Sequence, residues 1–521
     1  MGTDLCRHHC GCAVVLFAVL VQSFNRSFMV FLVKKCTVHM RVCLINPPRI
    51  QPKAWGKPNV FPPIVLASVA AVLEKKHSVC VIDAPTEGWK NLVEMDETKY
   101  RVGLSAQTIA ERVGQWNPDV VVVEIPFSGW SKTAFEVVYA VKAVNKKIAV
   151  VLMGQHPSAR PEACLSDSDV DFVVIGEPEN TISELVDALE SGKQDFTTID
   201  GLGFKKSGNP VLTGKRAIIE DMDSLPFPAR HLLPMKVYYE AVKENPLRGE
   251  ISKPWTIMTT SRGCPYNCVF CTTCIVWGRT WRARTPKNVV DELEHVVKTY
   301  GVKQIDFYDE NMTLDKKRMA DICDLIVERG LHVDWFTPNG VRADTLDEPL
   351  LRKMKRSGCK KIRVAPESGV QRIVNDVIGK NLDLKTVEQA VVMCKKVGIK
   401  VGCFFVLGLI GETKADIEET IKFAYKLRSL GADSLIFSIA MPLYGTPLYE
   451  QAKEGGFLRE GFCDYALAAT EPLIETAEFS ADDLRELCAR ANLANPTFTR
   501  DKVLRAIRNP KKTIKILLKM K

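Results

Sequence analysis

Three cysteines, Cys264, Cys268 and Cys271, lie close together in the middle of the chain with the spacing CxxxCxxC. Thiolates placed in this way on one loop can bind three irons of a 4Fe–4S cluster. The fourth iron then has no protein ligand and offers a coordination position to a small molecule. Cys274 follows three residues later, so a zinc site with four cysteine ligands is the alternative.

The cysteine loop follows the first of six short apolar segments that alternate with helical patterns. The expected strands are Trp255–Thr260, Gln304–Tyr308, His332–Thr337, Lys361–Ala365, Val401–Leu407 and Ser434–Ile439. The expected helices between them are Pro286–Tyr300, Lys316–Arg329, Leu346–Ser357, Leu384–Val397 and Lys414–Leu430. This alternation predicts a partial (β/α)6 barrel, a fold in which chemistry gathers at the carboxyl ends of the strands.

Acidic residues and glycines come directly after later strands of this series. They are Asp309 and Glu310 after the second strand, Glu367 and Ser368 after the fourth, and Gly408, Gly411 and Glu412 after the fifth. Glycine allows a ligand to approach the backbone closely, and a carboxylate can accept hydrogen bonds. Glutamate is also common at helix N-termini, so each motif has a structural alternative. Their order along one barrel favours a binding site.

A second alternating series precedes the barrel. Its expected strands are Val42–Asn46, Ser78–Asp83, Asp119–Glu124, Ile148–Gly154 and Asp171–Ile175. Its expected helices are Pro63–Lys75, Ser105–Gln115, Lys132–Val144 and Ile182–Ser191. Unbroken Val and Ile runs are typical of parallel strands buried on both faces, so we expect a flavodoxin-like doubly wound sheet. Ligands bind such sheets beyond the carboxyl ends of the strands, where Asn46, Pro47, Gly154, His156, Gly176 and Glu177 lie.

These patterns divide the chain into five regions. They are a hydrophobic extension at 1–39, a ligand-binding domain at 40–195, a linker at 196–250, the barrel at 251–447 and a helical C-terminal region at 448–521 with a basic tail. The extension has three explanations: a start codon placed too early, with Met29 or Met40 as the true start, a membrane anchor, or a signal peptide. The globular pattern begins directly after Met40.

The cysteine spacing, with Phe270 before the last cysteine, resembles the signature of the radical S-adenosylmethionine superfamily. The resemblance covers about Trp255 to Pro447. It implies that the three cysteines hold the cluster, whose open iron binds S-adenosylmethionine and reduces it to a 5′-deoxyadenosyl radical. It also implies that the acidic and glycine motifs after the strands, together with Phe270, contact S-adenosylmethionine; the family's commoner motif after the second strand is Gly-Gly-Glu.

The first domain resembles the cobalamin-binding domains that accompany such enzymes. The resemblance lies in the motifs that follow its strands, from Leu44 to Pro48, from Gly154 to Pro157 and from Gly176 to Glu179. It implies that these turns contact cobalamin. The family's Asp-x-His-x-x-Gly motif, whose histidine binds cobalt, is absent after the first strand. The resemblance therefore implies cobalamin without that ligand, and His156 is a conceivable contact.

A corrinoid domain beside a radical generator implies methyl transfer to an unactivated carbon. The alternative within the same superfamily is an oxidative cyclase of the magnesium-protoporphyrin IX monomethyl ester cyclase type. Alternatives of another class are a non-catalytic corrinoid-binding protein and a zinc protein. An intact cluster motif argues against the first, and the absence of a His-Glu pair beside the cysteines argues against a hydrolytic zinc enzyme.

Composition limits the classes of molecule that this protein is expected to bind. The net charge of +9 in 521 residues is modest, and no module of interleaved basic and aromatic residues indicates nucleic-acid binding. The expected partners are a small-molecule or lipid-like substrate and an electron donor such as ferredoxin or flavodoxin. The basic segment from Arg500 to Lys521 can lie at an anionic membrane surface or cap the barrel as a solvated helix. Because the expected chemistry is sensitive to oxygen, we expect the enzyme in the cytoplasm, either free or associated with a membrane.

Overall fold

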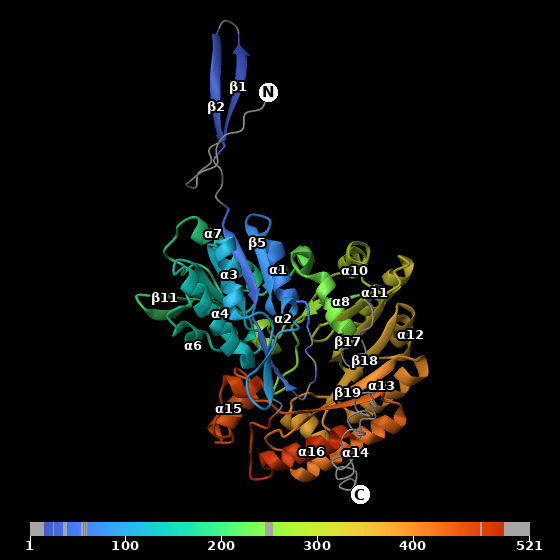
Figure 1. The fold of residues 1–521 in the computed structure, drawn as a ribbon. Coiled ribbons are helices and arrows are strands. Elements are labelled where there is room, and N and C mark those ends of the chain that lie inside the picture. The colour runs from blue at the N-terminus through green and yellow to red at the C-terminus, as the bar shows by residue number, and fades with distance from the viewer. Residues whose placement is uncertain are drawn as a thin grey trace.

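The computed structural model describes residues 15–23, 26–34, 39–53, 56, 58, 60–244, 254–468 and 471–493. Two α/β domains lie side by side in Figure 1, and an antiparallel hairpin of β1 (Val15–Ser23) and β2 (Arg26–Lys34) stands apart from them. Within the described part of the chain, no helix has the length and hydropathy needed to cross a membrane. A start at Met29 or Met40 stays a prediction.

A seven-stranded sheet forms the centre of the first domain, in the order β12-β11-β10-β9-β8-β3-β5. Its strands are β3 (Arg41–Asn46), β5 (Ser78–Asp83), β8 (Val120–Glu124), β9 (Ala149–Met153), β10 (Phe172–Val174), β11 (Leu202–Lys206) and β12 (Asn209–Leu212). The five strands from β10 to β5 are parallel. Every residue of β8 is buried, as expected for a strand covered on both faces.

Helices cover both faces of this sheet. The longer ones are α1 (Ile64–Leu73), α3 (Ala106–Trp116), α4 (Ser131–Val144) and α7 (Pro178–Glu190), and the short ones are α2 (Ala84–Glu87), α5 (Gln155–Ala159) and α6 (Pro161–Leu165). Helices α1 and α7 share one apolar core, and α3 and α4 share the core on the opposite face. The predicted doubly wound, flavodoxin-like sheet is confirmed.

Two features of the first domain go beyond the predicted arrangement, the place of a small hairpin and a second sheet. The hairpin β11–β12, expected as part of the linker, pairs antiparallel with β10 and extends the sheet. A separate three-stranded sheet contains β4 (Arg49–Pro52), β7 (Lys99–Val102) and β6 (Leu92–Glu94). These strands have three or four residues each and mix charged with apolar side chains, so no two-residue periodicity reveals them.

The second domain is built on six parallel strands in chain order, β13-β16-β17-β18-β19-β20. They are β13 (Trp255–Met258), β16 (Gln304–Phe307), β17 (Asp334–Val341), β18 (Cys359–Glu367), β19 (Lys400–Leu407) and β20 (Ser434–Ile439). The intervening helices are α10 (Pro286–Tyr300), α11 (Lys316–Glu328), α12 (Glu348–Arg356), α13 (Leu384–Val397) and α14 (Lys414–Leu430). The predicted partial (β/α)6 barrel is confirmed.

The described part of the C-terminal region combines helices with irregular segments, which an isolated bridge between Leu458 and Ile474 connects. It contains α15 (Pro447–Glu454), a 3-10 turn (Asp464–Ala468) and α16 (Ala481–Leu493), which packs against β20. The basic tail lies outside the described residues, so its contact with a membrane stays a prediction.

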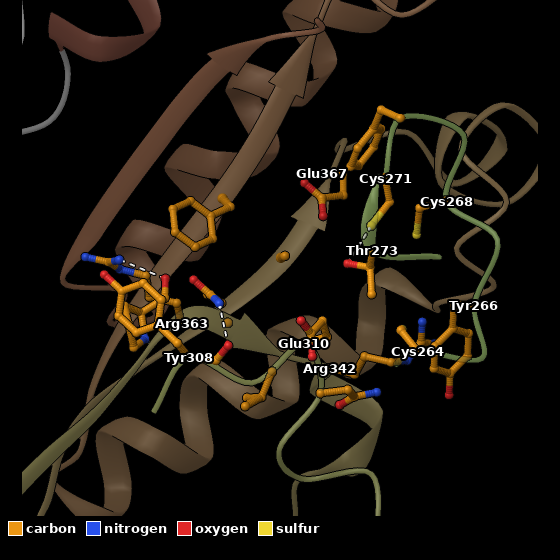
Figure 2. Close-up of a pocket in the computed structure, with 18 of the residues that line it drawn as sticks. Cys264, Tyr266, Cys268, Cys271, Thr273, Tyr308, Glu310, Arg342, Arg363 and Glu367 are labelled. Carbon is orange, nitrogen blue, oxygen red and sulfur yellow. Dashed lines mark hydrogen bonds between the residues drawn. The ribbon is translucent and has the colours of Figure 1, made fainter. Parts of the chain in front are cut away.

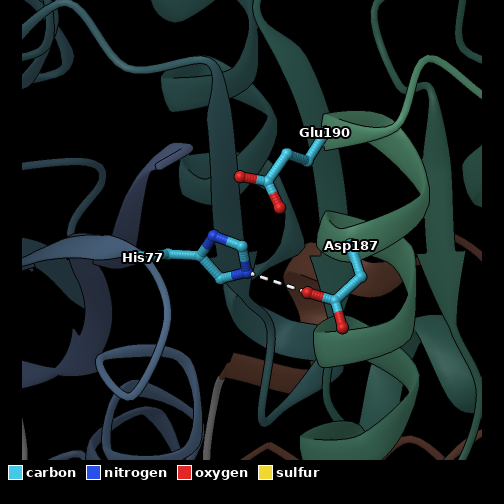
Figure 3. Close-up of side chains that lie close together, drawn as sticks. All are labelled: His77, Asp187 and Glu190. Carbon is cyan, nitrogen blue, oxygen red and sulfur yellow. Dashed lines mark hydrogen bonds and ion pairs between the residues drawn. The ribbon is translucent and has the colours of Figure 1, made fainter. Parts of the chain in front are cut away.

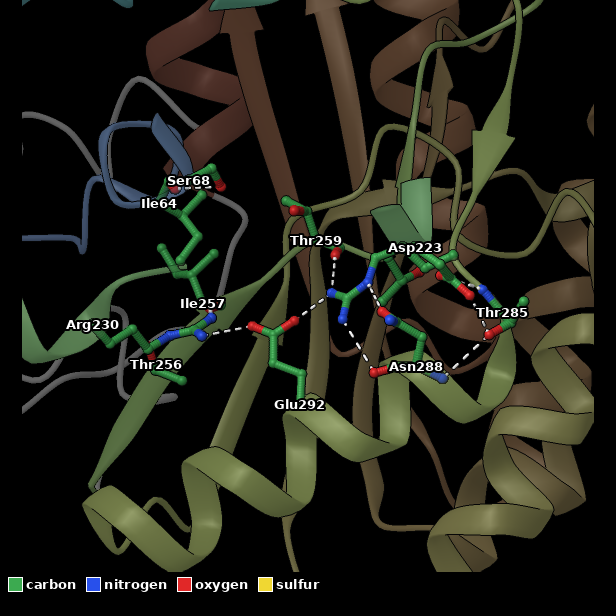
Figure 4. A network of polar contacts seen from close by, with 12 residues as sticks. Ile64, Ser68, Asp223, Arg230, Thr256, Ile257, Thr259, Thr285, Asn288 and Glu292 are labelled. Atoms are coloured by element: carbon green, nitrogen blue, oxygen red, sulfur yellow. Dashed lines mark hydrogen bonds and ion pairs between the residues drawn. The ribbon is translucent and has the colours of Figure 1, made fainter. Parts of the chain in front are cut away.

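A buried ion-pair network fixes the segment between the domains to the barrel (Figure 4). Arg230 lies in a 3-10 turn (Arg230–Leu232), and its Nη1 is 2.6 Å from Oε1 of Glu292 on α10. Glu292 also pairs with Arg284, and both Arg230 and Glu292 are 1% exposed. Arg230 donates a further hydrogen bond to the carbonyl oxygen of Ile257 on β13. This part of the expected linker is therefore packed against the barrel.

A second buried network joins the two domains directly. Arg262 of the short strand β14 (Ser261–Arg262) donates from Nη1 to Oε2 of Glu179 at 3.2 Å, and the same nitrogen is 3.4 Å from Oε2 of Glu177. Arg282 of β15 (Arg282–Ala283) also pairs with Glu177. The four side chains are buried. Since a buried charge is costly unless it is paired, these residues hold the domains in one arrangement.

We predict that Glu179→Gln destabilises the folded chain by about 3 kcal/mol, because it leaves a buried guanidinium short of counter-charge. Glu184, on the same helix α7, pairs with Arg216 at a half-exposed position, so Glu184→Gln is the matched control and should cost at most about 0.5 kcal/mol. Urea unfolding of both variants measures the difference. Equal midpoints for the two variants would contradict the assigned role of Glu179.

Candidate active site

One cavity of about 870 Å³ lies at the carboxyl ends of the barrel strands and is walled by both domains. Figure 2 shows the cysteine loop on one side of it and side chains of the strand ends on the other. The first domain contributes Arg49, Ile50, Gln51, Phe61 and Trp130 to its lining. A molecule in this cavity therefore faces the cysteines and the first domain at the same time.

The three cysteines of the CxxxCxxC motif all line the cavity. Their loop leaves β14 through Gly263, which has φ +81° and where an added Cβ would lie 2.3 Å from the carbonyl oxygen of Thr280. The middle of the loop is fixed by the backbone N–H of Val269, which donates to the carbonyl oxygen of Ile378 at 2.9 Å. Phe270 also lines the cavity.

The sulfur positions are not those of a preformed zinc site. Four ligands about 2.3 Å from one zinc ion lie about 4 Å from one another. The described cysteines include no set of three whose sulfur atoms all lie within 4.8 Å of one another. Ligands to separate irons of one cluster require this wider spacing. Cys274, at the start of the short helix α9 (Thr273–Val276), is absent from the lining. The donor set fits a 4Fe–4S cluster with one open iron.

The acidic pair after β16 divides into a structural and a cavity-lining residue. Oδ1 of Asp309 accepts hydrogen bonds from the backbone N–H and the hydroxyl of Thr260 and from the hydroxyl of Ser261, so it ties the second strand end to the first. Glu310 lines the cavity, and burial raises its pKa to about 8. Glu310 is thus the member of the pair placed for a ligand.

The fourth strand ends in a charged pair inside the cavity. Glu367 lines it with the left-handed backbone angle φ +67° and accepts from the Lys380 ammonium at 2.7 Å. Ser368 is buried and 2.9 Å from the hydroxyl of Thr420, so it supports the turn. Sequence reasoning missed Lys380, because it lies in an irregular turn thirteen residues after its partner.

The glycine motif after β19 forms a tight loop of its own, and its contact with S-adenosylmethionine stays a prediction. Oε2 of Glu412 accepts from the backbone N–H groups of Gly408 and Leu409, each at 2.8 Å, so this carboxylate closes its own loop. Gly408 approaches the side chain of Leu484 on α16, where an added Cβ would lie 2.6 Å away. Gly411 has φ +98°. These three residues are absent from the cavity lining.

The residues expected to contact cobalamin lie at the carboxyl ends of the first sheet but are absent from the cavity lining. Asn46, followed by Pro47, donates to Asp83 at 2.8 Å. Gly154 has φ +113° and an added Cβ would lie 2.7 Å from the carbonyl oxygen of Ile125, so this turn needs glycine. Gly176 has φ +85° at the end of β10.

The two ionisable residues of that group are engaged with the second half of the chain. Nε2 of His156 is 3.7 Å from Asp464, and burial lowers its pKa to about 4, so the ring is neutral at pH 7. Glu177 is held by Arg262 and Arg282. These contacts across the domain interface leave no local pattern in the sequence, and a contact of either residue with cobalamin stays a prediction.

The comparisons with known proteins agree with this arrangement. Residues 258–424 match the model of the Radical SAM superfamily, and residues 58–186 match that of the B12 binding domain. An uncharacterised methyltransferase of Pyrococcus horikoshii is 32% identical over 467 residues, which cover 89% of this chain and 94% of the relative. Cytidylyl-2-hydroxyethylphosphonate methyltransferase of Streptomyces wedmorensis is 28% identical and covers 87% of this chain and 89% of its own length.

Other relatives are matched over less of the chain or at lower identity. Anaerobic magnesium-protoporphyrin IX monomethyl ester cyclase of Rubrivivax gelatinosus is 29% identical over 62% of this chain and 56% of its own length. The solved radical S-adenosylmethionine methyltransferase TsrM from Kitasatospora setae, with cobalamin and a 4Fe–4S cluster bound, has a TM-score of 0.63 at 18% identity, covering 81% of this chain and 76% of TsrM. The chain therefore belongs to the radical S-adenosylmethionine superfamily, in the group whose barrel follows a B12 binding domain.

Proposed function

We propose that this enzyme transfers a methyl group to an unactivated carbon of a small molecule. The observation that carries the proposal is the single cavity walled by the cysteine loop and by the first domain. When bound, a 4Fe–4S cluster supplies the electron that cleaves S-adenosylmethionine, and cobalamin supplies a methyl carrier. The two relatives matched over almost their whole length both bear the name methyltransferase.

Different residues of the chain bind the cluster and S-adenosylmethionine in this proposal. Cys264, Cys268 and Cys271 hold the cluster. Glu310 and the Glu367–Lys380 pair present carboxyl groups and an ammonium to the same cavity, which suits the amino and carboxylate groups of S-adenosylmethionine. The aromatic rings of the first domain enclose the opposite wall. An external electron donor, ferredoxin or flavodoxin, completes the proposal.

Cyclisation is the second candidate, because a cyclase of the same superfamily matches 62% of the chain. The match leaves more than a third of the cyclase outside the alignment. The methyltransferase relatives leave much less of their own length outside it. Coverage of the whole two-domain unit therefore favours methyl transfer.

We predict that Cys268→Ala lowers bound iron and sulfide well below the roughly four irons per chain of the reconstituted protein, because one cluster corner loses its ligand. Release of 5′-deoxyadenosine from S-adenosylmethionine should fall below detection. Cys274→Ala, ten residues from the start of the motif and outside the cavity lining, is the matched control and should retain both. Full iron content in Cys268→Ala would contradict the assignment.

Methyl transfer and cyclisation give different products from the same reagents. The full chain, reconstituted with cluster and cobalamin and supplied with S-adenosylmethionine and a reductant, should release S-adenosylhomocysteine as well as 5′-deoxyadenosine. S-adenosylhomocysteine marks a methyl group given away, and mass spectrometry quantifies both nucleosides. Formation of 5′-deoxyadenosine alone, at every cobalamin concentration, would argue for the cyclase and against methyl transfer.

A further inference from the structure

Arg49 is a buried cation with no described carboxylate in ion-pair contact, and the charge of Asp83 attracts it only from a greater distance. It lines the cavity from β4, is 8% exposed, and makes one hydrogen bond, from Nη2 to Oε1 of Gln51 at 3.2 Å. Its Nε–H is buried with no acceptor. Among the described residues, no carboxylate forms an ion pair with it. A guanidinium offers five N–H donors, so most of its hydrogen-bonding capacity is unused.

Most other buried arginines among the described residues form ion pairs, whereas Arg318, outside the cavity lining, donates to two backbone carbonyls. Arg230, Arg262 and Arg282 each bind a buried glutamate, and Arg342 holds Asp344 and two backbone carbonyls. Buried charges in proteins are normally compensated in this way, because an unpaired one costs several kcal/mol. Arg49 departs from this pattern at the position where it meets the cavity. The missing partner is therefore expected inside the cavity.

The surroundings hold the guanidinium in place without neutralising it. Its central carbon lies 5.6 Å from the centre of the Phe61 ring and 5.9 Å from that of Trp130. Trp130 in turn donates from its indole N–H to the carbonyl oxygen of Ile50 at 2.9 Å, which fixes the strand that carries Arg49. Burial lowers the pKa of Arg49 to about 10, so it stays cationic at pH 7.

The other cations of the cavity have bonding partners within the second domain, although the Nε of Arg363 is also buried with no acceptor among the described residues. Lys380 is paired with Glu367 at 2.7 Å, and Arg363 donates to the carbonyl oxygen of Pro338 at 2.9 Å. Arg342 donates four hydrogen bonds, to Asp344 and to two backbone carbonyls. Arg49 is the cation that the first domain brings to the cavity, and most of its donors have no acceptor there among the described residues.

We propose that Arg49 is an oxyanion-binding residue that receives a phosphoryl or carboxylate group of a ligand in this cavity. A planar fork of N–H donors matches such groups with two parallel hydrogen bonds. The group can belong to the substrate, which then is an anionic small molecule, or to the nucleotide phosphate of cobalamin. The substrate source rests on the proposed function; the binding site itself does not.

Binding to the full chain, measured without turnover, tests the proposal. Inorganic phosphate is titrated into cobalamin-loaded protein and followed by phosphorus NMR line width. Cobalamin and cobinamide, which lacks the phosphate and nucleotide, are titrated into the cobalamin-free protein and followed by absorbance. Arg49→Met is compared with Arg41→Met, which removes an arginine stacked on Trp116 at the opposite end of the first sheet, 4.8 Å from that ring.

Two results support the proposal and identify the source. Affinity for phosphate that falls roughly ten- to hundredfold in Arg49→Met, with cobalamin binding unchanged, indicates a substrate oxyanion. Affinity for cobalamin that falls by a similar factor, with cobinamide binding unchanged, indicates the cofactor phosphate. Arg49→Lys should retain part of the affinity in either case, because it keeps the charge and loses the fork.

Thermal unfolding separates binding from a structural role. Because Arg49 is buried without a direct ion pair to a described residue, ligand-free Arg49→Met should melt no lower than the unaltered protein. A large fall in Tm with unchanged phosphate and cobalamin binding would overturn the proposal, as would affinities that match those of Arg41→Met. These readouts are independent of methyl transfer, so failure of the proposed reaction leaves them interpretable.

Figure 3 shows a second cluster outside the cavity, His77, Asp187 and Glu190, whose ligand atoms lie within 4.8 Å of one another. Asp187 already pairs with Lys76 at 2.6 Å and with His77 at 3.1 Å. The carboxylate that a metal ion would need is thus engaged by an ammonium. This cluster is explained as a surface ion pair and carries no further proposal.

Discussion

The buried ion pair between the first domain and strand β14, which leads into the cysteine loop, is the constraint on which the rest of the site depends. Arg262 directly precedes the glycine that leads into the cysteine loop, and its partner Glu179 lies at the start of α7. A buried guanidinium and a buried carboxylate stabilise each other only at short range, so this pair tolerates little displacement. The pair consequently holds the start of the cysteine loop against the end of the first sheet, and the cavity lies between the two domains that it joins.

The cavity combines charges that would be unfavourable in a plain protein core. Glu310 stays largely protonated because it is buried, and Glu367 keeps an uncommon left-handed backbone beside Lys380. Such local costs are typical of sites where a ligand later provides the missing partner. The unpaired Arg49 is the clearest case, and it comes from the opposite domain. Each domain therefore brings to the cavity charged groups that a ligand can pair with.

The sequence predicted what is encoded locally. The alternation of apolar strands and amphipathic helices identified both sheets, with bounds within a few residues of β3, β5, β19 and α13. The cysteine spacing identified the loop that lines the cavity. These features need neighbours only a few residues apart, which is why one sequence suffices to recognise them.

The roles of the charged residues depend on partners that are distant in the sequence. Asp309, Glu412 and Glu177 are acidic residues after strands, yet the structure uses each of them to fasten backbone or another domain. Arg49, by contrast, lies in a short strand with no periodicity and reaches the cavity. Whether a charged side chain stabilises the fold or binds a ligand depends on the residues that face it in the structure. A single sequence does not show these long-range neighbours.

The interlocked domains limit how this architecture can be recombined during evolution or in the laboratory. Residues 187–257 separate the two matched family models and would look like a neutral crossover region. Yet the hairpin β11–β12 belongs to the first sheet, whereas Arg230, further along the same stretch, belongs to the barrel. Even a crossover between them would separate Glu179 from Arg262. In a chimera of two related enzymes, both residues of the ion pair must therefore come from the same parent. The two domains are separate in the sequence, but they can be exchanged only together.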